Sequence, residues 1–453
     1  MSGQVSRRDR LVWTARMVWD ASRQGRFPYR SPGAIRAVQE RRIRAIVAHA
    51  GTHVPFYREA FRRLGLDPAE IRTAADLGRL PLVARSDVQR DPEYFRSRAW
   101  PLEACATLES GGSSGQPLTV FRDPASFPAE AAQRERLRSL VTRLAGRRFR
   151  HREADIVPID SSAADAVRQV RRQTLVPGGL RIERRIYSIW RSPAELIPEL
   201  DRYRPDVIGS YGSYLEALFA HLREGQATMR LPPVVVYGAD AMTDGMRAYI
   251  LHELGIELLS SYNAIETPGV GWECEAHRGY HLNVDLCPVR LVRPDGAPAA
   301  AGESGEVVIS NLVNHGSVLL NYRLGDLASP LPGPCPCGRT LPMLSFLEAR
   351  ATAWLHLGGG RTIHPHAARL PFRKERDLWR YQVVQEERRR FLVRTVLNPD
   401  CDRDLMAPRL AALLRKSLGQ DVDVRVECVD DLPRGASGKV QTVVPLPPRG
   451  GLR

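Results

Sequence analysis

Apolar residues recur at helical spacing near the start of the chain and in short β-type runs farther along it. Between Ile35 and Leu64 the apolar positions Ile35, Val38, Ile43, Ile46 and Val47 predict helices. Later, β-rich runs alternate with helical ones. We expect strands at Leu118–Phe121, Asp206–Ile208, Val234–Tyr237 and Ile256–Ser261, and helices at Ala129–Leu144, Ser213–Leu222 and Asp244–Leu254, the last with Thr243 as N-cap. This alternation predicts a layered α/β fold.

The pattern changes again in the last third of the chain. VRLVRPDG and GEVVISNL, after Val289, predict antiparallel strands, with a turn at Asp295-Gly296. Beyond Arg350 we expect a smaller α+β unit: a strand pair within Tyr381–Val396, a helix at Asp404–Leu418 and a strand at Val422–Val429. We therefore divide the chain into domains 1–349 and 350–453, with a helical opening segment over about residues 1–100.

Composition narrows the class of protein. The 453 residues are 43% hydrophobic and 26% charged, which is ordinary globular composition and excludes disorder and collagen. No run approaches the ~20 apolar residues of a membrane span, and arginines interrupt the apolar residues near the start. We expect neither a membrane span nor a signal peptide, and a cytoplasmic location. A homodimer is one assembly that the sequence leaves open.

The net charge of +15 raises the question of nucleic-acid binding. Only three of the 66 cationic residues are lysines, and the arginines spread along patterned segments rather than forming a basic tail. A basic solvated surface is the favoured interpretation. The seven cysteines are unevenly spaced, so metal binding or inert burial is favoured over a disulfide framework.

Two motifs have the chemistry of phosphate binding. The run Ser110-Gly111-Gly112-Ser113-Ser114-Gly115 can converge backbone N–H groups and hydroxyls on an anion, although a flexible turn has the same composition. Near the C-terminus, a glycine-flanked loop ends in Lys439, whose charge suits a phosphate oxygen. A turn with a solvated lysine is the alternative.

Two further motifs suit the rest of a nucleotide. Tyr262 follows a predicted strand and can stack on a purine, and Glu266, four residues later, can hold Mg²⁺. Asp326, after a glycine turn, can accept the hydroxyls of a ribose. Taken alone, a core tyrosine and a surface turn with a solvated aspartate are the more common explanations of these residues.

These four motifs, in this order, resemble the adenylate-forming superfamily, and specifically its phenylacetate-CoA ligase-like branch. Gly111 to Pro117 is similar to the family's phosphate loop, Tyr262 and Glu266 to its Tyr-x-x-x-Glu motif, Tyr322 to Asp326 to its Tyr-Arg-x-Gly-Asp motif, and Pro433 to Lys439 to its terminal lysine motif. The resemblance implies that Gly238 and Ala239 border adenine, that Arg350 contacts the ribose, and that a hinge joins the large adenylating domain to the small one.

The resemblance also implies an acyl pocket, and the chain departs from the family at three positions, of which Leu118, in place of a lysine after the phosphate-loop proline, counts least. The residues that we expect to line this pocket are Ser210, Tyr211, Gly212, Tyr237 and Asp240. Ala353 stands where the family has its hinge aspartate, which puts the domain rotation and the second half-reaction in question. Asn263 stands where many members have glycine.

Cysteine and histidine spacing gives a separate signal for metal. Cys274 and His277, with Cys335 and Cys337, supply four ligands for a closed zinc site, and His281 competes with His277 for the fourth place. Four protein ligands leave no open position for water, so the expected role of this zinc is structural.

We therefore predict an AMP-forming ligase that uses ATP and Mg²⁺ to activate a carboxylic acid, aryl or a related small acid, and passes the acyl group to coenzyme A. Lys439 and Glu266 are the expected catalytic residues. Two alternatives stay open. One is an adenylating enzyme that serves an amine or hydroxyl acceptor or stops at nucleotidyl transfer, in polysaccharide or secondary metabolism. The other is a degenerate nucleotide-binding scaffold.

Overall fold

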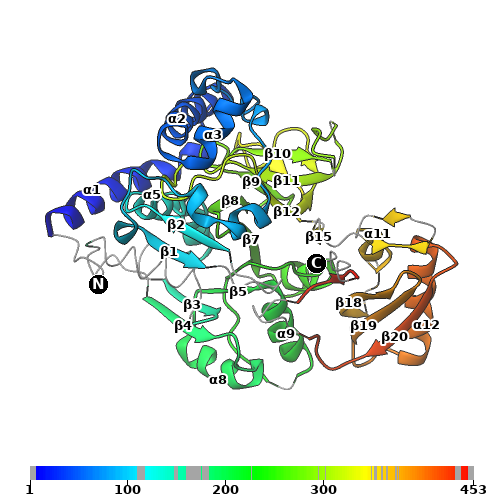
Figure 1. Ribbon diagram of the computed structural model, residues 1–453. Coiled ribbons are helices and arrows are strands. Elements are labelled where there is room, and N and C mark those ends of the chain that lie inside the picture. Colours follow the sequence, from blue (N-terminus) through cyan, green and yellow to red (C-terminus); the bar gives the residue numbers. More distant parts are fainter. Residues whose placement is uncertain are drawn as a thin grey trace.

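Figure 1 shows a large N-terminal part and a smaller C-terminal domain beside it. The computed structural model describes residues 7–109, 118–146, 151–159, 175, 183–225, 227–293, 295–300, 302–347, 349–350, 355–358, 361–363, 366–372, 375, 377–433 and 440–446. The α/β class predicted from the sequence is confirmed, with strands and helices in the arrangement described below.

Helices open the chain, as predicted. Pro32 at the first position of α2 and Ser31 as its N-cap begin the longest of them, and Val54 separates it from α3. Ile43, Ile46 and Val47 of α2 are buried together with residues of α3. The helices of this part are α1 (Arg7–Gln24), α2 (Pro32–His53), α3 (Pro55–Leu64) and α4 (Arg85–Arg90).

A nine-stranded sheet forms the centre of the large part, with the strand order β13-β14-β9-β8-β7-β6-β5-β3-β4. Strands β4, β3, β5, β6 and β7 pair in parallel, whereas β7, β8, β9, β14 and β13 pair antiparallel. The strands are β3 (Arg152–Val157), β4 (Glu183–Ser188), β5 (Val207–Tyr211), β6 (Val234–Gly238), β7 (Glu257–Ala264), β8 (Thr267–Glu273), β9 (Tyr280–Leu282), β13 (Pro330–Leu331) and β14 (Met343–Leu344).

Helices cover both faces of this sheet. On one face α8 (Pro193–Tyr203), α9 (Gly212–Arg223) and α10 (Asp244–Ala248) bury an apolar cluster that includes Ile208 and Val235. On the other face α6 (Glu135–Leu144) packs against Val234 and Leu259. The predicted helix 129–144 is two helices, since α5 (Ser126–Gln133) ends at Arg134 before α6 begins. The predicted helix 244–254 is α10 followed by a π-helical turn, Tyr249–Glu253.

Two smaller sheets complete the large part. Strands β1 (Ala106–Glu109) and β2 (Thr119–Arg122) form an antiparallel pair. Strands β10 (Val289–Val292), β11 (Gly305–Ile309), β12 (Tyr322–Ala328) and β15 (Ala349–Arg350) form an antiparallel sheet. The turn predicted at Asp295-Gly296 is confirmed, because Gly296, at φ 85°, donates its N–H to the Arg293 carbonyl at 2.9 Å.

The C-terminal domain has its own sheet and apolar core. Its sheet has the order β20-β19-β18-β21, and α12 packs on it through Leu410 and Leu414. The predicted strand pair, helix and last strand are all present. The elements are β16 (Leu355–His356), β17 (Thr362–Ile363), α11 (His366–Arg369), β18 (Leu378–Glu387), β19 (Arg390–Leu397), α12 (Arg403–Leu418), β20 (Asp423–Cys428) and β21 (Val443–Val444).

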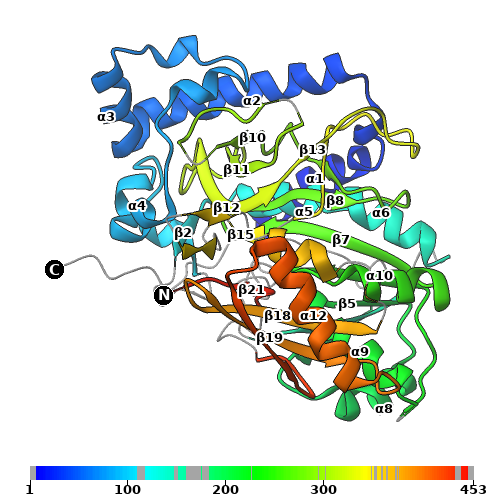
Figure 2. The ribbon, with the colours of Figure 1, turned by 90° about the vertical axis from the view of Figure 1, so that its right-hand side faces the viewer.

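The start of β18 docks the C-terminal domain onto the large part, and Figure 2 shows this strand beside α9 and α10. Trp379 is buried in the apolar cluster of the large part, and its carbonyl accepts the Thr243 hydroxyl at 3.0 Å. Arg380 Nε lies 3.4 Å from Oε2 of the buried Glu216, whose other oxygen accepts the Thr243 N–H. The interface therefore contains a buried ion pair.

Across the described residues, no helix combines the length and the apolar character needed to cross a lipid bilayer.

Candidate active site and metal centre

The carboxyl ends of β5, β6 and β7 bring the predicted adenine-border, acyl-pocket and Tyr262–Glu266 residues to one edge of the sheet. Strand β5 ends at Tyr211, β6 at Gly238 and β7 at Ala264, and β5 pairs with β6 and β6 with β7. Ligands of open α/β sheets bind outside the carboxyl ends of such strands. Residues that lie far apart in the sequence are therefore neighbours at this edge.

Tyr262, from the nine-stranded sheet, and Asp326, from the four-stranded sheet of β12, are in contact. Tyr262 comes from β7 and Asp326 from β12, and the Tyr262 hydroxyl donates to Asp326 Oδ2 at 2.8 Å. Both residues are buried, with 4% and 8% of their surfaces exposed. The tyrosine expected to stack on a base thus also orients the carboxylate expected to bind a ribose. In the ladder of β12 and β15, Arg350 is the register partner of Asp326.

Glu266 occupies the tight connection between β7 and β8 and is held from three sides. The Tyr322 hydroxyl donates to its Oε1 at 2.8 Å, Arg85 Nη1 lies 3.6 Å from the same oxygen, and Asn311 donates its side-chain N–H to the Glu266 carbonyl at 2.8 Å. Burial and the adjacent carboxylate raise the pKa of Tyr322, so the phenol is a neutral donor. A carboxylate held in this way is preorganised to hold a hard cation.

The segment after β6 has a strained turn at the predicted adenine border. Ala239 has φ 68°, which is uncommon for a residue with a side chain. Asp240 N–H donates to the Gly238 carbonyl at 2.8 Å, and a Cβ at Gly238 would lie 2.8 Å from Ser261 Oγ. The glycine therefore permits the close approach of β6 and β7 at this edge. Local strain of this kind is common at ligand sites.

Three of the five predicted acyl-pocket residues are held by specific bonds. Asp240 accepts the Ser213 hydroxyl at 2.6 Å, whereas the Ser210 hydroxyl donates to the Ile156 carbonyl at 2.6 Å. Tyr237 is buried, and its hydroxyl accepts an N–H of Arg247. Ser210 and Tyr237 thus have structural partners of their own. Of the other two, Tyr211 is half-buried and Gly212 begins α9.

One charged residue at the site had not been predicted. Arg122, at the end of β2, is 2% exposed, pairs with the buried Glu130, and donates to the Ile265 carbonyl at 2.7 Å, directly beside Glu266. Burial lowers the pKa of Arg122 to about 9. The sequence signal was available, because Arg122 follows the apolar run 118–121 that leads away from the glycine-rich motif.

Several predicted residues lie outside the described part of the chain. The phosphate-binding run, Ser110, Gly111, Gly112, Ser113, Ser114 and Gly115, is one such group, and Lys439 and Ala353 are others. The side chain of Arg350 is likewise not described. Their predicted roles stay predictions.

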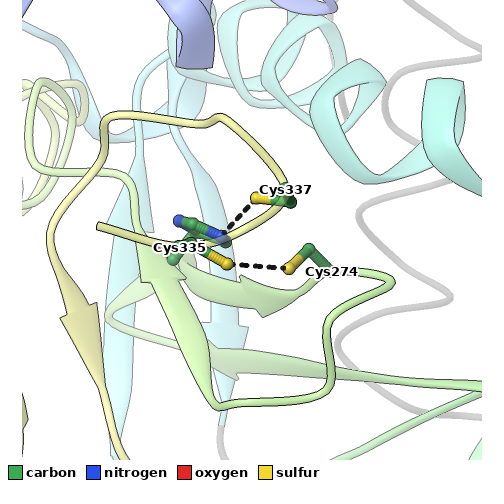
Figure 3. Close-up of side chains that lie close together, drawn as sticks. Cys274, Cys335 and Cys337 are labelled. Atoms are coloured by element: carbon green, nitrogen blue, oxygen red, sulfur yellow. Dashed lines mark hydrogen bonds between the residues drawn. The ribbon is translucent and has the colours of Figure 1, made fainter. Parts of the chain in front are cut away.

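Four potential metal ligands converge at the far edge of the large sheet (Figure 3). Cys274 follows β8, His281 lies in β9, and Cys335 and Cys337 come from the connection between β13 and β14. Their ligand atoms all lie within 4.8 Å of one another, with Cys274 Sγ 3.6 Å from Cys335 Sγ and Cys337 Sγ 3.3 Å from His281 Nε2. Tetrahedral zinc with bonds of about 2.3 Å would place its ligands roughly 3.8 Å apart.

The histidine of this cluster is His281, the competing candidate of the sequence, and not His277, so the placement of His277 among the four is corrected. His277 has φ 51°, and its Nδ1 lies 3.0 Å from Glu273 Oε1, which directs the ring away from the thiols. Burial lowers the pKa of His281 to about 4, so its ring is neutral, the form that binds metal. Its Nδ1 contacts the Leu341 carbonyl at 3.4 Å and leaves Nε2 on the cysteine side. Three thiols and a neutral imidazole fit zinc.

Comparison with known proteins bears on this arrangement. Residues 360–445 match the family model of the CapK C-terminal domain. The phenylacetate-coenzyme A ligase of Thermus thermophilus is 26% identical over 91% of this chain and 96% of its own length. That of Escherichia coli is 30% identical over 72% of this chain and 73% of its own length.

The chain belongs to the phenylacetate-coenzyme A ligase family. The resemblance drawn from the four motifs is thereby confirmed. A solved structure of 2-hydroxyisobutyryl-CoA ligase in the postadenylation state has the same fold, with a TM-score of 0.72 at 16% identity over 94% of this chain and 91% of the other. Within this ligase family, the edge formed by Tyr262, Glu266 and Asp326 is the candidate active site.

Proposed function

We propose that the protein activates a carboxylic acid with ATP, releasing pyrophosphate and forming an acyl-adenylate, and then transfers the acyl group to coenzyme A. Family membership supports this reaction, as do relatives named phenylacetate-coenzyme A ligase. The observation that carries the proposal is the pairing of Tyr262 with Asp326 and of Tyr322 with Glu266 at the carboxyl edge of the sheet.

Each of these residues has a role in the first half-reaction. Asp326, oriented by Tyr262, accepts hydrogen bonds from the ribose hydroxyls, while the run from Ser110 to Gly115 supplies N–H and hydroxyl donors to the phosphates. Glu266 would hold Mg²⁺, and the bound ion would supply positive charge next to the phosphates of the leaving pyrophosphate. Lys439 stabilises the negative charge that develops on the α-phosphoryl group as the carboxylate attacks.

The acid and the acceptor complete the proposal. Tyr211, half-buried at the end of β5, and Asp240, which is fixed by Ser213, support an aryl or related small acid as substrate. Coenzyme A is the proposed acceptor. Ala353, in place of the family's hinge aspartate, favours the second candidate, transfer to an amine or hydroxyl.

The test is pyrophosphate release with ATP and Mg²⁺ across phenylacetate, other aryl acids and aliphatic acids, each with and without coenzyme A. Acid-dependent release that yields a thioester is the expected result. Acid-dependent release without a thioester, with the acyl group trapped by hydroxylamine, would favour the second candidate. If no acid releases pyrophosphate and ATP still binds, the ligase proposal is wrong and the nucleotide-binding scaffold is favoured.

We further propose that Cys274, His281, Cys335 and Cys337 bind one structural zinc ion. The donor set, the ligand distances and the neutral imidazole support it. By joining the ends of β8 and β9 to the connection between β13 and β14, the metal would fix the antiparallel half of the sheet. Four protein ligands leave no position for a catalytic water.

The domain division and the cellular context belong to the same proposal. A boundary at residue 350 agrees with the separate apolar core that begins at Leu355. A cytoplasmic location agrees with the use of ATP and with seven cysteines, described as free thiols. The homodimer that the sequence left open awaits a measurement of mass in solution.

A further inference from the structure

The outward face of α1 is unusually apolar for a face in contact with solvent. Four large side chains on it are more than half exposed: Leu11 at 54%, Val12 at 57%, Val18 at 57% and Trp19 at 59%. Elsewhere in the described residues, no helix has more than one exposed large apolar side chain. Leu11, Ala15 and Val18 are three or four residues apart, and Val12 and Trp19 are seven apart. These spacings place all five side chains in one stripe along the helix.

Neighbouring helices do not need this stripe for packing, because α1 already packs against them through its opposite side. Trp13, Met17 and Gln24 are only partly exposed. The Gln24 amide oxygen accepts a hydrogen bond from Arg136 Nε, with 2.7 Å between the two atoms. The helix packs against α5 and α6. Figure 1 shows α1 at the edge of the molecule opposite the C-terminal domain, so domain motion does not cover the stripe.

Arginines accompany the apolar stripe. Arg8, Arg16 and Arg23 are exposed on the same side, and the Arg23 guanidinium lies 3.8 Å from the centre of the Trp19 ring. Among the residues of α1 whose side chains the structure describes, none of the exposed ones is acidic, since Asp20 is only partly exposed. Apolar and cationic groups thus share one surface of the helix.

We propose that this face of α1, which we call the α1 face, binds the surface of an anionic lipid bilayer. A helix that lies in the membrane plane buries Leu and Trp among the acyl chains and places arginines at the level of the headgroups. Anionic lipids attract each such arginine. The chain would then be a peripheral membrane protein, bound without a spanning helix.

The charge and area of the α1 face disfavour a second copy of the chain as its occupant. A two-fold contact between two α1 faces would bring the arginines of both copies together. Among the exposed side chains of α1 that the structure describes, none is acidic and able to pair with these arginines. The four large side chains expose on the order of 400 Å², about half of the ~800 Å² that each partner buries in a standard interface. Insertion into lipid needs no complementary protein surface of that size.

The experiment is co-sedimentation of the full chain with vesicles of phosphatidylcholine alone or mixed with phosphatidylglycerol. The wild type is expected to sediment with the anionic vesicles and much less with neutral ones, and salt is expected to weaken binding. Trp19→Ser combined with Val18→Ser, and separately Arg16→Glu combined with Arg23→Glu, are each expected to lower the partition coefficient at least tenfold.

Leu405→Ser is the matched control, because Leu405 is 72% exposed on α12 of the C-terminal domain. It is expected to bind vesicles as the wild type does, and circular dichroism checks that every variant is folded. If the wild type does not sediment with anionic vesicles, or the α1 variants bind as well as Leu405→Ser, the proposal is overturned. If instead the α1 variants convert a dimer into a monomer and no vesicle binds, the occupant is a second copy.

Discussion

The buried pair of Glu216 and Arg380 gives the sharpest prediction about how the C-terminal domain is held. Glu216 is 5% exposed and Arg380 2%. Burial raises the pKa of Glu216 to about 7, and the nearby Asp240 acts in the same direction. Arg380 and the hydrogen bonds from Thr243 lower this pKa but do not outweigh burial. Arg380 also contacts Asp431, which is largely exposed and contributes less.

The sign of the pH dependence follows from this raised pKa. A carboxyl group that binds its proton more tightly in the folded state stabilises that state fully below its unfolded pKa of 4.5, and this stabilisation is lost as the pH rises through about 7. The shift of about 2.5 units corresponds to roughly 3 kcal/mol. Above neutrality, Arg380 therefore faces a buried carboxylate.

Arg380→Met is the perturbation. Removing one partner of a buried pair costs about 3–5 kcal/mol, and here protonation of Glu216 limits the cost. The pKa of Glu216 rises further in the variant, so the cost should grow by about 1.4 kcal/mol from pH 6 to pH 8, where the wild type loses its proton and the variant keeps it. Glu216→Leu combined with Arg380→Met removes the charge and should recover most of the stability.

Scanning calorimetry at the two pH values measures these effects, since it resolves separate transitions of the two parts. Arg191→Met is the matched control, because Arg191 forms an exposed pair with Glu199 on α8, and no measurable change is expected. A loss in Arg380→Met that is the same at both pH values, or a double variant no more stable than the single one, would refute the reasoning.

Three further predictions concern the site. Lys439→Ala should abolish acid-dependent pyrophosphate release while ATP binding persists. The control Lys416→Ala, at an exposed lysine of α12, should leave pyrophosphate release unchanged. Pyrophosphate release by Lys439→Ala at the wild-type rate would exclude the catalytic role of Lys439. Tyr262→Phe removes the hydrogen bond to Asp326, and hydrogen bonds to charged groups contribute about 1.5–3 kcal/mol. The KM for ATP, measured from initial rates, should therefore rise about tenfold or more. An unchanged KM would contradict the role of Tyr262 in positioning Asp326. Cys335→Ser should lose one zinc ion per chain, measured by elemental analysis, and should have a lower melting temperature. The control Cys401→Ser, at a cysteine outside the cluster, should change neither quantity. Full zinc content in Cys335→Ser would rule out the site.

The centre of the fold could be predicted because its parallel strands are buried on both faces. Val234–Tyr237 is a continuous apolar run and Ile256–Ser261 has Leu258 and Leu259 at its centre, and both are strands of the sheet. The order of these strands then brought Gly238 and Tyr262 to one edge, as their motifs implied. For these elements local pattern and global topology agree.

Strands β3 and β4 could not be predicted, because their charged residues satisfy one another across the ladder. Arg184 of β4 pairs with Glu153 and with Asp155 of β3, the second contact at 3.1 Å. A sequence pattern scores such residues as exposed, although Glu153 is 7% exposed. The Arg122 and Glu130 pair beside Glu266 escaped prediction for the same reason.

The histidine of the proposed zinc site shows a different limit of prediction from sequence. Spacing along the chain favours His277, which follows Cys274 by three residues, but the turn between β8 and β9 directs its ring to Glu273. His281 is seven residues from Cys274, yet the pairing of Trp272 with His281 places it beside the end of β8. Strand register, which only the fold supplies, decides between the two histidines.

The contact between the domains bears directly on the open question of the acceptor. Transfer to coenzyme A in the resembled family involves rotation of the small domain, and a rotation that moves β18 away from α9 would separate Arg380 from Glu216. Separation exposes Glu216 to water and removes the burial that raises its pKa to about 7, so the separated state holds this proton less tightly than the docked state. Low pH therefore stabilises the docked state, and a rising pH favours separation of the two parts. The rate of the thioester step should therefore rise as the pH increases from 6 to 8, whereas adenylate formation should not follow this dependence.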